Sequence, residues 1–153
     1  MLDDFIALSS VLIAEPNPDR LLAQKYLDRL LAAPVEGEPM DKRVGALLDT
    51  FREIRAGGGD LEEGVRQRIV NDATHAPIAR QVIFLWYTSA FLVRSVKPDA
   101  AVNLETGRPD TSTTLQFGSP EQYFRGMMWS VIRAHPPALS GGYFGYWRYP
   151  PEN

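Results

Sequence analysis

The chain has 153 residues, of which 44% are apolar, and a net charge of −3. This length and composition are typical of one domain with a buried core, and the mild, evenly mixed charge gives no basic stripe for nucleic acid. Because cysteine is absent, disulfides, thiolate metal sites and thiol nucleophiles are excluded.

Helical periodicity predicts about six helices along the chain. Apolar residues recur every three or four positions, and proline or glycine ends most of the runs. The expected helices span residues 2–14, 18–33, 41–56, 60–71, 74–93 and 119–133. Asn17 is the expected cap of the second helix, while Asp60 and Ser119 begin capping boxes. The acidic pairs at residues 3–4 and 62–63 suit the positive ends of helix dipoles.

The helix over residues 74–93 is apolar on nearly all sides and is expected to be central. The last helix is expected to bury Tyr123, Phe124, Met127, Met128, Val131 and Ile132. Residues 97–118 have no helical period, and residues 101–108 suit a small hairpin. The sequence therefore predicts an all-α fold, a small irregular bundle of about six helices over residues 1–134, followed by an extended tail over residues 135–153.

Candidate chemistry is sparse. His75 and His135 lie at expected helix ends without acid–base partners, so we interpret them as capping or surface residues. The glycines at 57–59 could form an anion cradle, but we prefer to interpret them as a plain loop between helices. Trp86 and Trp129 suit a flat-ligand pocket, although such aromatics are typical of a core. We predict no catalytic, cofactor-binding or metal-binding residue in this chain.

The tail carries the strongest functional signal. Its four prolines and three glycines exclude a helix or a central strand, yet five aromatic residues fall within seven positions. Interfaces favour such rings, so we predict that the tail binds a partner, with packing onto the chain's own surface as the alternative. The predicted partner-binding residues are Pro136, Pro137, Tyr143, Phe144, Tyr146, Trp147, Arg148 and Tyr149. Trp147 and Tyr143 are the expected anchors.

Four segments resemble one protein family in their order and spacing. They are residues 2–10 (LDDFIALSS), 83–88 (IFLWYT), 123–129 (YFRGMMW) and 136–147 (PPALSGGYFGYW). Together they are similar to the small (gamma) subunits of FAD-dependent sugar and sugar-alcohol dehydrogenases, which include those of sorbitol, fructose and glucose dehydrogenase. The match extends over nearly the whole chain.

The resemblance implies a subunit without chemistry of its own. In that family the small subunit binds a large flavoprotein of the glucose–methanol–choline type, which holds FAD and oxidises the sugar, and electrons often pass to a cytochrome c subunit. The small subunit is thought to help the large one fold and to carry its export signal. This chain departs from the pattern because it has no twin-arginine signal and has Ser140 where the family commonly has cysteine. Its loop over residues 97–118 is also longer than is usual in the family.

We therefore expect a non-catalytic, chaperone-like accessory subunit of an FAD-dependent dehydrogenase or oxidase. The alternatives are a self-associating structural protein and a small-ligand-binding or enzymatic helical domain. The longest apolar stretch, residues 82–93, is shorter than the ~20 residues of a membrane helix, so no membrane span is expected. If Met1 is native we expect a cytoplasmic protein; a removed signal, or export with a partner, would make it periplasmic.

Overall fold

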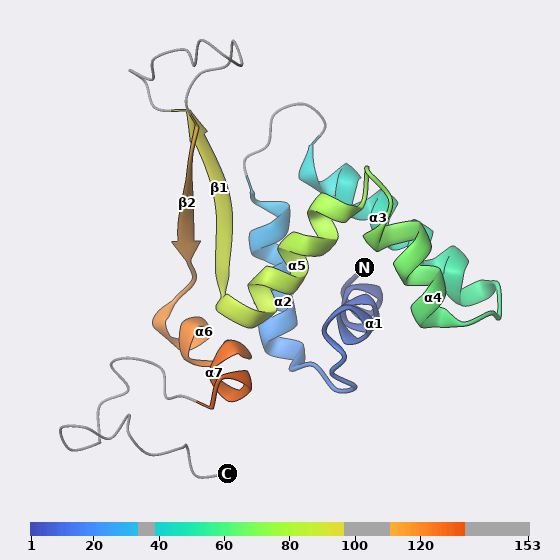
Figure 1. Cartoon of the computed structure of the whole chain (residues 1–153), viewed down its shortest axis with the longest axis horizontal. Helices are drawn as coiled ribbons and strands as arrows, with labels where there is room; N and C mark the ends of the chain where they lie inside the picture. The colour runs from blue at the N-terminus through green and yellow to red at the C-terminus, as the bar shows by residue number, and fades with distance from the viewer. Residues whose placement is uncertain (34–38, 97–110, 134–153) are drawn as a thin grey trace. The chain divides into compact units, whose positions relative to one another are not determined.

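The computed structural model describes residues 1–33, 39–96 and 111–133, and side chains are described for these residues except 92–96 and 111–116. The chain divides into two compact units, Met1–Tyr87 and Thr88–Asn153. Helices of the first unit are α1 (Leu2–Ile13), α2 (Arg20–Leu31), α3 (Met40–Ala56), α4 (Leu61–Val65), the π-helix η1 (Arg66–Val70) and α5 (Ala76–Thr88), which ends one residue into the second unit. The second unit contains strands β1 (Ala90–Val96) and β2 (Thr111–Phe117) and helices α6 (Pro120–Phe124) and α7 (Met128–Val131) (Figure 1). The predicted small all-α fold is confirmed, and the two strands are an addition to it.

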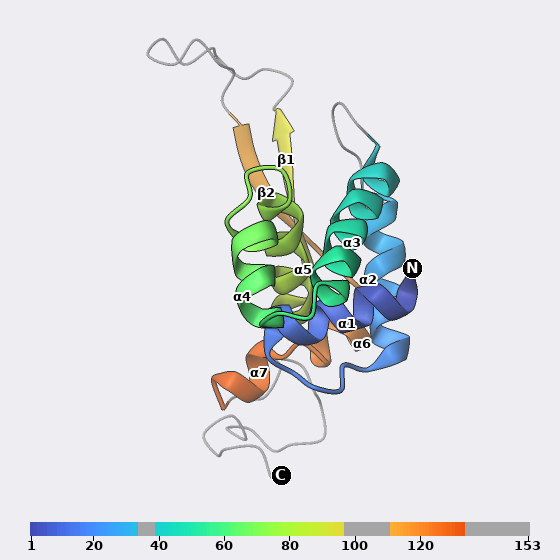
Figure 2. The same cartoon turned by 90° about the vertical axis from the view of Figure 1, so that its right-hand side faces the viewer.

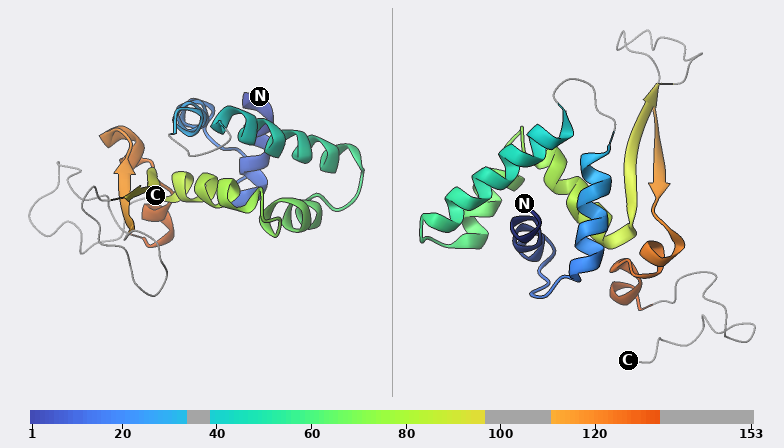
Figure 3. Two further views of the ribbon diagram at one scale, coloured as in Figure 1. Left: turned by 90° about the horizontal axis from the view of Figure 1, so that it is seen from above. Right: turned by 180° about the vertical axis from the view of Figure 1, so that it is seen from behind.

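The first unit is a helical bundle with a continuous apolar core. Helix α1 contacts α2 and α3, and α4 contacts α3 (Figure 3). The largest fully buried side chains of this unit include Phe5, Leu8, Tyr26, Leu30, Leu47, Phe51, Ile69 and Leu85. Trp86 of α5 is buried edge-on against Tyr26 of α2, with ring centroids 5.1 Å apart. This contact confirms that Trp86 is a core residue.

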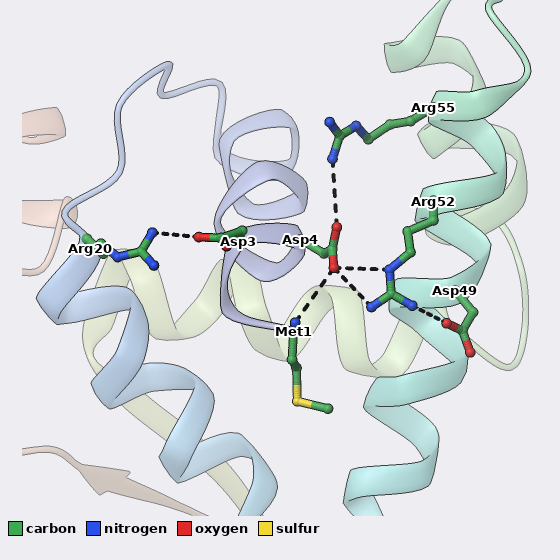
Figure 4. Close-up of polar contacts among 7 residues, drawn as sticks. All are labelled: Met1, Asp3, Asp4, Arg20, Asp49, Arg52 and Arg55. Atoms are coloured by element: carbon green, nitrogen blue, oxygen red, sulfur yellow. Dashed lines mark hydrogen bonds and ion pairs between the residues drawn. The ribbon is translucent and has the colours of Figure 1, made fainter.

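The acidic first turn of α1 is tied to two neighbouring helices. Asp4 Oδ2 accepts a hydrogen bond from Nε of Arg52 in α3 at 3.0 Å and forms an ion pair with Nη2 of the same residue at 2.9 Å. Arg55 Nη1 lies 3.8 Å from the other oxygen of Asp4 (Figure 4). Asp3 pairs with Arg20 of α2 at 2.6 Å. The hydrogen bond from Arg52 holds the pKa of Asp4 below its usual value, although partial burial opposes the shift. Dipole compensation alone was therefore an incomplete interpretation of this acidic pair.

Side-chain caps set the start of several helices. Asp19 Oδ1 accepts a hydrogen bond from the Leu22 N–H at 2.8 Å, so the prediction that Asn17 caps this helix is wrong. The helix begins two residues later than expected. Asp60 Oδ1 accepts from the Glu63 N–H at 3.0 Å, as predicted.

The predicted helix over residues 74–93 is too long. Helix α5 ends at Thr88, Ser89 has a left-handed φ of 55°, and the chain continues as β1. Strand β1 pairs with β2 in an antiparallel register that runs from Ala90↔Phe117 to Val96↔Thr111. A continuous apolar run does not distinguish a buried helix from a strand. Here the run forms a strand because it pairs with the threonine-rich strand β2. The hairpin predicted over residues 101–108 lies outside the described residues.

The predicted last helix, over residues 119–133, is divided in two. Helix α6 begins with the predicted capping box, in which Ser119 Oγ accepts from the Gln122 N–H and Gln122 Oε1 accepts from the Ser119 N–H. The helix then ends at Phe124, and α7 begins at Met128 (Figure 2). Gly126 lies in the break, where its weak helix propensity favours the interruption.

Close packing of α4 on α3 requires a glycine. A Cβ atom at Gly64 would lie 2.5 Å from Cγ2 of Ile54. Ile54 is buried in α3, and its β-branched side chain is restricted to few rotamers in a helix. Gly45 in the middle of α3 differs, because a Cβ there would meet no atom within 4 Å.

We predict that Gly64→Ala lowers the free energy of unfolding by about 1–3 kcal/mol, because it overpacks this contact. Gly45→Ala is the matched control and is expected to raise the free energy of unfolding by about 0.5–1 kcal/mol, through helix propensity alone. Urea unfolding followed by far-UV circular dichroism measures both. Equal effects of the two substitutions would contradict the packing argument.

Candidate partner-binding surface

The predicted partner-binding residues all lie in the segment 134–153, outside the described residues. Residues 117–133, which directly precede this segment in sequence, are described and form the end of β2 and the helices α6 and α7 (Figures 1 and 2).

An aromatic cluster connects β2, α6 and α7. Tyr123 of α6 lies edge-on to Phe117 at the end of β2 and to Trp129 of α7, with ring centroids 5.5 Å and 5.1 Å away. Phe124 lies 5.9 Å from Tyr123 in a tilted arrangement. The Trp129 indole N–H donates a hydrogen bond to the carbonyl oxygen of Tyr123 at 2.8 Å. This bond uses the only polar group of the indole, so its remaining exposed edge is apolar.

Ser89 holds α6 at the base of the β-ribbon. Its side chain is fully buried, and its hydroxyl donates a hydrogen bond to the backbone carbonyl of Gln122. The Ser89 carbonyl in turn accepts from the Gly118 N–H at 2.9 Å. These two bonds join the start of β1 to both ends of the turn between β2 and α6. Ser89 therefore fixes the position of the aromatic cluster.

The last helical segment does not bury the face predicted for it. Val131 and Ile132 are 63% and 55% exposed, and the other four predicted members, Tyr123, Phe124, Met127 and Met128, are only partly buried. Phe117 is also 54% exposed. The prediction of a buried face is wrong because α6 and α7 are too short to form one amphipathic stripe. We define the C-terminal apolar surface as Phe117, Tyr123, Trp129, Val131 and Ile132.

Sequence reasoning missed Phe117 as a surface residue. It lay in a segment without a helical period, and its role depends on the strand that ends there. The available signal was the threonine-rich stretch before it, residues 111–114 (TSTT), because threonine is enriched in strands.

The other sequence candidates have structural roles. His75 Nε2 lies 3.1 Å from Thr50 Oγ1, and its backbone N–H donates to Asp72 Oδ1 at 2.9 Å. His75 is therefore a partly buried residue that directly precedes α5, where its carbonyl accepts a hydrogen bond from the Ala79 N–H at 3.0 Å, and its ring contacts Thr50 of α3. His135 lies outside the described residues.

The glycines at 57–59 precede α4, which has only five residues. The Asp60 carboxylate already occupies the start of this helix, so the loop interpretation fits better than the anion cradle. Trp86 is buried in the core of the first unit, whereas Trp129 belongs to the aromatic cluster of the second unit. No group of three histidine or acidic side chains suited to a metal occurs within the ranges that the structure describes.

No helix among the described residues is both long enough and apolar enough to cross a membrane. The chain matches no model of a known protein family, and no curated protein matches it in sequence.

We predict that Ser89→Ala lowers the free energy of unfolding by about 1–3 kcal/mol, because a buried carbonyl loses a hydrogen bond. The near-UV circular dichroism of the aromatic cluster should weaken as well. Ser9→Ala is the matched control, since this serine is also fully buried but its hydroxyl has no hydrogen-bond partner among the described residues. We expect Ser9→Ala to leave stability unchanged or to raise it. A larger loss for Ser9→Ala than for Ser89→Ala would contradict the anchoring role of Ser89.

Proposed function

We propose that the chain is a non-catalytic accessory subunit that binds and stabilises a large FAD-dependent dehydrogenase or oxidase subunit of the glucose–methanol–choline type. FAD and the substrate pocket belong to that partner. The tail is the main binding segment, with Trp147 and Tyr143 as anchors and Arg148 beside them as a cation–π or ion-pair contributor.

One observation carries the proposal. Apolar residues are left exposed at Val131 and Ile132, immediately before a tail that contains five aromatic rings. Soluble monomers seldom expose large contiguous apolar patches, and such patches mark interaction sites. Permanent subunit interfaces are large and comparatively apolar, which suits this end of the chain.

The resemblance described above supports the choice of partner. Two of its four segments, residues 123–129 and 136–147, lie in the second unit. The same unit contains the exposed residues Val131 and Ile132 and the tail. A cytochrome c subunit and export from the cytoplasm are further features that the resemblance suggests for the complex.

We predict that deletion of residues 136–153 leaves the helical bundle folded but abolishes co-purification with an FAD-loaded flavoprotein subunit of this type from the same host. The reason is that the deletion removes every predicted anchor. Far-UV circular dichroism measures folding, and flavin absorbance in the affinity eluate measures binding.

A chain that lacks only residues 152–153 is the matched control, because it keeps all five rings, and it should bind normally. The full-length variant Tyr143→Ala/Trp147→Ala should lose most binding without any truncation. Flavoprotein retained by the truncated chain would contradict the proposal. Turnover by the isolated chain would instead establish an enzyme, and a stable oligomer of the chain alone would establish a self-associating protein.

A further inference from the structure

We draw no further inference here: the strongest candidate, the exposed C-terminal apolar surface at the end of β2 and on α6 and α7, carries no proposal of its own, because no contact among the described residues shows what covers Phe117, Val131 and Ile132.

Discussion

The turn at Ser89 is the constraint on which the C-terminal unit depends. A left-handed residue ends the long apolar helix α5 and turns the chain into β1, and its buried hydroxyl then bonds to the carbonyl of Gln122. This bond and the bond from the Gly118 N–H to the Ser89 carbonyl connect the start of β1 to the segment in which β2 passes into α6. In that segment the ring of Tyr123 lies between Phe117 and Trp129. The C-terminal apolar surface is thus positioned by a residue that lies inside the unit.

The two units differ in how much of their apolar side-chain surface is buried in the described residues. The first unit buries most of its large apolar side chains, with Leu21 as an exposed exception, and ion pairs of Asp3 and Asp4 connect α1 to α2 and α3. The second unit has a two-stranded ribbon, which is marginally stable by itself, and two helices of five and four residues. Its exposed residues Val131 and Ile132 directly precede the tail in sequence.

The sequence predicted the first unit well, because its helices are bounded by local signals. Gly57 and Asp60 mark an end and a start, and helical periodicity identifies the buried positions between them. The strands could not be predicted in the same way. All four residues from Ala90 to Val93 are apolar, so this run fits a helix and a strand equally well. Its partner strand also lies about 20 residues away along the chain. The sequence did not predict that Val131 and Ile132 are exposed, because their exposure follows from the break between α6 and α7 near Gly126. The capping box at Ser119 and the apolar stripe both indicated one continuous helix.

Hydrogen–deuterium exchange of the full-length chain, with and without the FAD-loaded flavoprotein subunit, tests the central claim most directly. We predict slower exchange over residues 136–153 in the complex, with no change over residues 2–87, because the partner covers the tail. Unchanged exchange over residues 136–153, or protection confined to the first unit, would contradict the account.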